Sequence, residues 1–245
     1  MIVLFTDFGL SGPYLGQVRA VFAESVPSVP VIDLFADAPT ADPRAAAYLL
    51  AAYDDVFPAG TIFFAVVDPG VGTARLPVVL LADDRWYVGP DNGLLALVAR
   101  RAATTKVWEI TWRPPHLSAS FHGRDLFAPA VARLALGEAP PGKERPGLSE
   151  PMPDWPDELA EIVYIDHYGN AFTGMRATKL SPRAKLVIGG HTLGRARTFG
   201  DLKPGSAFWY QNSNGLAEIA VASGRADRTL GIEVGTPVSV ISGDG

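Results

Sequence analysis

The chain has 245 residues, enough for one large domain or two modest ones, and 48% of them are apolar and 19% charged, which is a globular composition. The formal net charge of -5, without a basic run, argues against binding to a nucleic-acid backbone, and the absence of cysteine excludes disulfides, thiol catalysis and thiolate metal sites. The N-terminal apolar run is too short for a signal peptide and no stretch approaches the roughly 20 apolar residues that cross a bilayer, so we expect a soluble, cytoplasmic protein.

The first half of the chain alternates short apolar runs with helical patterns. Strands are predicted over residues 2–5, 31–34, 61–67 and 106–111, with an antiparallel pair over 78–82 and 86–88. Helices are predicted over residues 14–24, 43–53, 94–101 and 125–136. The last helix begins at Asp125, which we expect to cap it. Strands that alternate with helices predict the α/β class, here a domain over residues 1–145 with a mostly parallel sheet flanked by helices.

A change of composition marks the end of this domain. Residues 137–157 contain six prolines, so we expect a linker without regular structure there. After it, short strands are predicted over residues 162–166, 171–175, 185–188, 192–198, 207–211, 216–222 and 236–241. Asn214-Gly215 is a strong hairpin dipeptide between two of them. This pattern predicts a smaller all-β domain over residues 158–245, a barrel or a sandwich.

Charged side chains gather where strands of the first domain are predicted to end. Parallel α/β sheets bind ligands at the carboxyl ends of their strands. Asp7 follows the first strand, Asp68 ends the third, and Arg75 stands seven residues after Asp68 in the loop DPGVGTAR. His122 lies in the loop SASFHGRD, just before the last helix of the domain. We therefore expect these four side chains to face one polar cleft.

Each of these residues also has an ordinary structural explanation. Aspartate is common in turns and caps, a loop arginine is often solvated, and a single histidine often serves only as a hydrogen-bonding residue. Dinucleotide-binding, P-loop, zinc-protease and nucleophile-elbow motifs are absent, and the four histidines lack a metal-ligand spacing, so we expect no metal. Periodicity and topology by themselves predict only an α/β domain with a polar cleft, followed by a β domain.

Six motifs in chain order carry a more specific signal. They are FTDFG (5–9), VVDPGVGT (66–73), VGPDNGLL (88–95), FHGRDLFAPAVA (121–132), IDHYGN (165–170) and NSNG (212–215). Together they resemble the S-adenosyl-L-methionine hydroxide adenosyltransferase family, which is related to the fluorinase and the chlorinase. Its members hydrolyse S-adenosylmethionine to adenosine and methionine and have an N-terminal α/β domain and a C-terminal β-barrel. The resemblance implies the same fold and activity here, with S-adenosylmethionine (SAM) as the substrate and no metal or cofactor.

The resemblance also implies roles for individual residues. Asp68, Arg75 and His122 match the catalytic set thought to bind and activate the attacking water, and Asp7 matches the aspartate that holds both ribose hydroxyls. Five residues of the β domain match contacts to the rest of the substrate: Asp166 and Ser213 at the methionine end, Asn170 at the adenine, and Tyr168 and Phe199 as the aromatic pair that encloses the base. In this family the site lies between the α/β domain of one subunit and the barrel of its neighbour in a homotrimer.

Some positions depart from the fluorinase pattern. Asn214 stands where the fluorinase has an arginine and Ala41 where it has a tryptophan, and IDHYGN is one residue shorter. These departures leave open how the methionine carboxylate is bound. The halogenating relatives have a tyrosine at the position of Asp68 and a different residue at that of His122, so this chain resembles the hydrolase. Two alternatives stay open, a non-catalytic SAM or adenosine sensor and a SAM-dependent halogenase such as a chlorinase.

Overall fold

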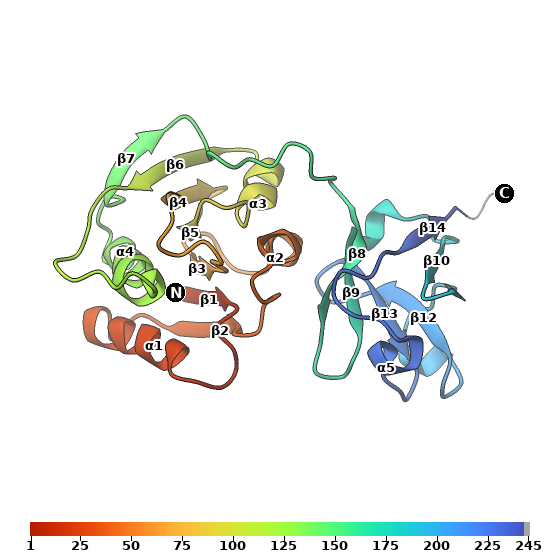
Figure 1. The fold of residues 1–245 in the computed structure, drawn as a ribbon. Helices are drawn as coiled ribbons and strands as arrows, with labels where there is room; N and C mark the ends of the chain where they lie inside the picture. The colour runs from red at the N-terminus through yellow and green to blue at the C-terminus, as the bar shows by residue number, and fades with distance from the viewer. Residues whose placement is uncertain (243–245) are drawn as a thin grey trace. The chain divides into compact units, whose positions relative to one another are not determined.

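The chain folds as two units, Met1–Met152 and a second unit that begins at Pro153, and the computed structural model describes residues 1–242 (Figure 1). The first unit contains the elements predicted for the α/β domain, and the second contains those predicted for the β domain. Among the described residues there is no helix with the length and apolar character needed to cross a membrane.

A seven-stranded sheet forms the centre of the first unit. Its strands are β1 (Ile2–Thr6), β2 (Val31–Phe35), β3 (Ile62–Val66), β4 (Pro77–Ala82), β5 (Arg85–Pro90), β6 (Thr105–Ile110) and β7 (Gly142–Arg145). Their order across the sheet is β2-β1-β3-β5-β4-β6-β7. Every residue of β1 and β3 is buried, as continuous apolar runs require when both faces of a sheet are covered.

The α/β class is confirmed, and the sheet is mixed because it contains the predicted antiparallel pair, β4 and β5. β2, β1, β3 and β5 run parallel to one another, whereas β4, β6 and β7 continue the sheet through antiparallel pairs. The tight turn between β4 and β5 explains the change of direction. Asp83 and Asp84 both have positive φ, which is typical of the hairpin turn that joins antiparallel neighbours.

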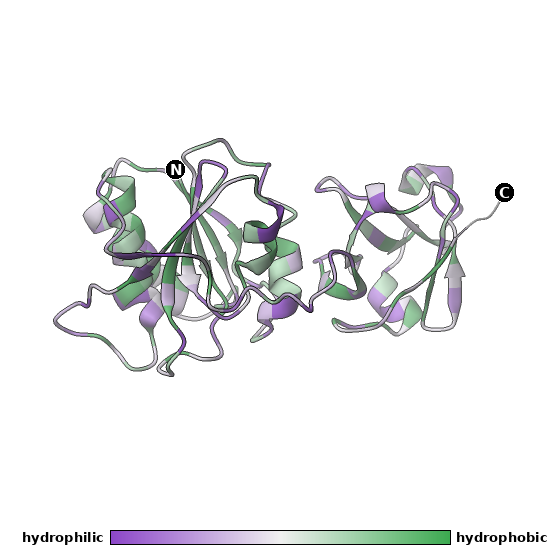
Figure 2. Ribbon diagram, turned by 90° about the horizontal axis from the view of Figure 1, so that it is seen from above, coloured by the Kyte–Doolittle hydropathy of each residue, from purple (hydrophilic) through white to green (hydrophobic). Residues whose placement is uncertain are grey.

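Helices cover both faces of this sheet. They are α1 (Tyr14–Ser25), α2 (Pro43–Leu50), α3 (Ala96–Arg101) and α4 (Ala128–Ala135). α1 and α4 lie together on one face, where Phe22 and Val131 pack in one core with Ile2 and Phe64, and α2 and α3 lie together on the other (Figure 1). Successive strand residues point to opposite faces, so β1 and β3 supply both cores. The central strands are accordingly coloured as hydrophobic in Figure 2.

Asp125 does not cap the last helix of this unit, contrary to the prediction. A π-helical turn over Gly123–Phe127 precedes α4, and His122 is the residue before that turn. The Asp125 carboxylate instead accepts the backbone N–H of Ser118 (2.9 Å) and pairs with Arg124. It therefore closes the loop that carries His122.

The two units divide at Met152 and Pro153, inside the expected linker, but the stretch up to Met152 belongs to the first unit and is not without regular structure. β7 pairs with β6 at the edge of the sheet, and the prolines of this stretch flank β7 without interrupting it. Beyond β7, the buried carboxylate of Asp91 accepts the backbone N–H groups of Ser149 (2.6 Å) and Glu150 (3.2 Å). The chain is thus held to the first unit almost to its end at Met152.

The second unit contains two antiparallel sheets. One consists of β12 (Ala207–Gln211), β13 (Leu216–Val221), β9 (Ala171–Arg176) and β8 (Leu159–Ile165), and the other of β11 (His191–Leu193), β10 (Lys185–Ile188) and β14 (Ser239–Ile241). Bridges between Glu161 and Pro237 and between Arg195 and Trp209 link the sheets at both edges, which closes the predicted barrel. One short helix, α5 (Ala226–Leu230), follows β13. The strand expected over residues 192–198 ends at Leu193.

Gly89 of β5 approaches β3 too closely for a side chain. A Cβ atom there would lie 2.0 Å from the carbonyl oxygen of Ala65. We expect Gly89→Ala to force the strands apart and lower the free energy of unfolding by about 2 kcal/mol or more, as measured by denaturant unfolding. The control is Gly16→Ala in α1, where nothing lies within 4 Å of the Cβ position and alanine favours the helix. Equal unfolding midpoints for the two variants would contradict this packing.

Candidate active site

The loop between β3 and β4 positions Asp68 and Arg75 where the parallel strands end. Inside the loop, the Thr73 hydroxyl donates to the carbonyl oxygen of Gly70 (2.7 Å) and closes a turn. The side-chain amide of Asn92, which follows β5, donates to the carbonyl oxygen of Val67 (2.9 Å). The loop is therefore held both by its own turn and by the segment after the neighbouring strand. This conformation places Arg75 beside Asp68.

Gly72 brings a second loop against the first. It has a φ of 80°, and a Cβ atom on it would lie 2.7 Å from the carbonyl oxygen of Ala119. Glycine thus permits both the backbone conformation and the close approach. Ala119 stands three residues before His122. The contact therefore places the histidine loop beside the loop of Asp68 and Arg75.

Asp68, Arg75 and His122 form one hydrogen-bonded cluster, so the structure brings these predicted residues together. Arg75 Nε donates to Oδ1 of Asp68 (3.0 Å), and Nη2 of Arg75 donates both to Oδ2 of Asp68 and to Nδ1 of His122 (3.0 Å). The guanidinium lies over the Phe127 ring, 5.2 Å from its centroid. The side chains of Arg75 and Asp68 are only 9% and 7% exposed, so Arg75 is not a solvated loop charge.

The contact with Arg75 determines the tautomer of His122. A guanidinium only donates hydrogen bonds, so Nδ1 accepts and the neutral ring carries its proton on Nε2. Burial, and then the positive charge of Arg75, lower the pKa of His122 below its ordinary value. The cluster therefore combines an ion pair with a neutral imidazole, and donor groups of this kind suit a polarised water or an anion.

Asp7 lies just after β1, as predicted. Burial is the main cause that raises the pKa of Asp7 above its ordinary value, and the negative charge of Asp68 adds to the effect. Oδ2 of Asp7 accepts the backbone N–H of Ala41 (2.9 Å). Ala41 has a φ of 53°, a conformation that costs a residue with a Cβ atom about 1 kcal/mol. This strained turn holds the Asp7 carboxylate in place.

The other predicted site residues line a single cavity of about 700 Å³ in the second unit. They are Asp166, Tyr168, Asn170, Phe199 and Ser213. Asp166 organises the turn between β8 and β9, since its Oδ1 accepts the backbone N–H of Asn170 (2.8 Å). Tyr168 is 72% exposed and Phe199 37% exposed, which leaves aromatic surface open for a planar ligand.

Sequence reasoning missed four polar residues of this cavity, Tyr210, Asn212, Glu218 and Ser223. Tyr210 of β12 and Glu218 of β13 are cross-strand partners, and the Tyr210 hydroxyl donates to Oε1 of Glu218. The available signal was Glu218 itself, a single carboxylate in the apolar strand LAEIAV. The pattern of polar and apolar residues along that strand does not show whether the Glu218 side chain faces the hydrophobic core or a ligand pocket.

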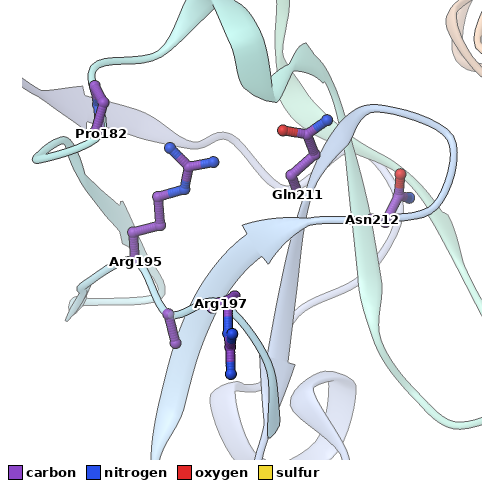
Figure 3. A pocket seen from close by; sticks show the side chains of 6 residues that line it. Pro182, Arg195, Arg197, Gln211 and Asn212 are labelled. Atoms are coloured by element: carbon purple, nitrogen blue, oxygen red, sulfur yellow. The ribbon is translucent and has the colours of Figure 1, made fainter. Parts of the chain in front are cut away.

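A second cavity of the same unit, of about 540 Å³, has the opposite charge. Figure 3 shows its lining by Pro182, Arg195, Ala196, Arg197, Gln211 and Asn212. The larger cavity contains the carboxylates of Asp166 and Glu218 and no cationic side chain among its described lining residues. A cationic ligand therefore suits the larger cavity. Within residues 1–242, no three His, Asp or Glu side chains are grouped to hold a metal ion.

Comparisons with known proteins agree over almost the whole chain. Models of the SAM hydroxide adenosyltransferase N-terminal and C-terminal domains match residues 2–143 and 160–239. A Thermus thermophilus protein named (R)-S-adenosyl-L-methionine hydrolase is 39% identical, with 98% of this chain and 99% of that protein covered. A Salinispora tropica protein of the same name is 38% identical, with 97% and 96% covered. The crystal structure of an uncharacterized conserved protein from Thermotoga maritima matches with a TM-score of 0.89 at 29% identity, covering 98% of this chain and 100% of that one. This chain therefore belongs to the SAM hydroxide adenosyltransferase family.

Proposed function

We propose that this protein hydrolyses S-adenosyl-L-methionine to adenosine and L-methionine, by attack of an activated water or hydroxide at the ribose 5′ carbon. The observation that carries the proposal is the buried guanidinium of Arg75, which is hydrogen-bonded both to Asp68 and to Nδ1 of His122. Full-length similarity to proteins named (R)-S-adenosyl-L-methionine hydrolase supports it.

The reaction exchanges a carbon–sulfur bond for a carbon–oxygen bond. Oxygen of the nucleophile bonds to C5′ as the C5′–sulfur bond breaks, and the electron pair of that bond stays on sulfur. The sulfonium thus leaves as the neutral thioether of methionine, and one proton of the consumed water goes to solvent. Opposite charges cancel when hydroxide attacks a sulfonium, so a preorganised site that excludes bulk water favours the step. The positive charge that attracts the nucleophile is that of the Arg75 guanidinium. The proposed mechanism uses no metal or cofactor.

Each member of the cluster has a distinct task in this mechanism. Arg75 holds the anionic or polarised nucleophile through charge-assisted hydrogen bonds, and Asp68 fixes the plane of the guanidinium. His122 offers Nε2–H to orient the nucleophile, because its Nδ1 is occupied by Arg75. Proton acceptance by Nδ1 requires the ring to leave Arg75 first. Orientation is therefore the role that we assign to His122.

The remaining residues bind and align the substrate. Asp7 binds both ribose hydroxyls and so places C5′ in line with the nucleophile, and such positioning is worth up to about 7–11 kcal/mol. The residues of the second unit divide the rest of the substrate: Tyr168 and Phe199 enclose the adenine, Asn170 contacts its polar edge, and Asp166 and Ser213 contact the methionine end. The methionine carboxylate takes neutral donors such as the side-chain amide of Asn214, which replaces the arginine of the fluorinase.

We further propose a homotrimer in which each site combines the first unit of one copy with the second unit of another. The chemistry of the two units supports this arrangement. The first unit carries the groups that hold a nucleophile. The second unit carries the aromatic and carboxylate groups that suit a positively charged adenosyl compound. Neither set alone is sufficient for the proposed reaction.

The alternative functions fit the cluster less well. A sensor has no need of a buried arginine that contacts both an acid and an imidazole. A halogenase fits less well because the halogenating relatives have a tyrosine at the position of Asp68 and a different residue at that of His122, whereas here Asp68 is present and makes two bonds to Arg75. The hydrolase is therefore the better proposal.

Turnover in oxygen-18 water is the direct test. Purified protein should convert SAM, without added metal and regardless of chloride, into methionine and adenosine that carries the heavy oxygen at its 5′ position, as read by mass spectrometry. Formation of 5′-chloroadenosine would establish a halogenase in place of the hydrolase. Tight binding without conversion would establish a sensor.

Replacement of Arg75 by lysine tests the cluster. Lysine keeps the charge but cannot donate to Asp68 and His122 together, so we expect Arg75→Lys to lower kcat about 100-fold or more with little change in KM. The control is Arg19→Lys, since Arg19 forms an exposed pair with Asp33 on the same unit. Steady-state kinetics of both variants are the measurement. A normal kcat for Arg75→Lys would remove Arg75 from the chemistry.

Mixed oligomers test whether two copies share a site. Arg75→Ala disables the first unit and Asp166→Ala the second, so each variant alone should be inactive. Co-expressed in equal amounts, they should recover about a quarter of wild-type activity if each site joins two copies at random. No recovery, in oligomers shown to contain both variants, would mean that each chain builds its own site.

A further inference from the structure

The larger cavity of the second unit holds two carboxyl groups where the resemblance accounts for one. Asp166 is assigned to the methionine end, whereas nothing assigns a role to Glu218. No lysine, arginine or histidine is among the described residues that line this cavity. The cavity therefore carries an excess of negative charge that its own lining does not balance.

Glu218 is deeply buried within this lining. Its side chain is 3% exposed, and the Tyr210 hydroxyl from the neighbouring strand donates to its Oε1. The side-chain amides of Asn212 and Asn170 also stabilise its charged form, whereas the charge of Asp166 opposes it. These are the groups that face Glu218 from the elements around it, and none is a cation.

Such a placement is costly unless a ligand compensates for it. Burial is the largest cause that raises the pKa of Glu218 above its ordinary value. A buried charge without a partner destabilises a fold, and a cross-strand pair with Tyr210 could be formed as well by a neutral residue. Glutamine at this position would still accept the Tyr210 hydroxyl. The acid is therefore better explained by a cation that binds in the cavity.

We propose that Glu218, together with Asp166, binds the α-ammonium group of the methionine portion of the substrate. This inference rests on the proposed function for the identity of the ligand. An ammonium has three N–H donors and can bond to both carboxylates, whereas a sulfonium has none. Tyr210 donates to Oε1 of Glu218, and a carboxylate has acceptor sites for further donors, so the ammonium can still bond to it. Asp166 alone gives only part of the specificity for the α-ammonium group, and Glu218 adds to that specificity.

Calorimetric binding to the full-length protein tests the proposal with ligands that do not turn over. We expect Glu218→Gln to weaken the binding of L-methionine and of S-adenosyl-L-homocysteine about tenfold or more, and to leave adenosine binding unchanged. Adenosine lacks the ammonium, so it reports on the intact adenine side. The matched control is Glu233→Gln, because Glu233 is an exposed glutamate of the same unit.

Thermal unfolding of the ligand-free protein separates binding from a structural role. Removal of a buried charge should leave the Tm of Glu218→Gln equal to or above that of the wild type. A lowered Tm together with weaker binding of all three ligands would show that Glu218 only supports the fold, and unchanged binding of methionine would equally overturn the proposal. These measurements need no turnover, so a failure of SAM hydrolysis and a failure of this inference are distinguishable.

Discussion

The buried guanidinium of Arg75 is the interaction on which the site of the first unit depends. It joins two loops that are far apart in sequence, since Asp68 follows β3 and His122 precedes the π-helical turn before α4. Removal of one partner of a buried ion pair leaves an uncompensated buried charge and destabilises the fold. Asp68 and Arg75 must therefore both be kept in position by the loop that carries them. The close approach of Gly72 to Ala119 brings the two loops together, and the Phe127 ring lies under the guanidinium.

The two units carry complementary electrostatics for the proposed chemistry. In the first, Arg75 and a neutral His122 present donors to an oxygen nucleophile, and Asp68 limits the net positive charge. In the second, Asp166 and Glu218 lie among aromatic side chains, a combination that suits an organic cation with a planar ring. Because the charges of hydroxide and sulfonium cancel as the reaction proceeds, the step gains from alignment of the two reactants in a preorganised site that excludes bulk water.

Much of the first unit's site was predictable, and the exceptions have physical reasons. Strand ends located Asp7 and Asp68, because the parallel strands β1 and β3 end at one edge of the sheet. The antiparallel pair β4 and β5 was also predicted, whereas the edge strand β7 was not, because it lies in a proline-rich stretch that was expected to be a linker. Asp125 has the residue type of a cap, yet it bonds to Ser118 because a π-helical turn shifts the start of α4. In the second unit Glu218 was not predicted as a site residue, since the alternation of side chains along a strand does not distinguish a cavity wall from a hydrophobic core.

The sequence by itself determined the α/β and β division, the family and the residue types of the candidate site, because these depend on local periodicity and on motifs in chain order. Only the tertiary structure decided that Arg75 is buried between Asp68 and His122, which tautomer His122 adopts, and that Tyr210 and Glu218 share a cavity with Asp166. Burial, hydrogen-bond direction and the charge around a carboxyl group depend on neighbours that are distant along the chain, and no local pattern specifies them.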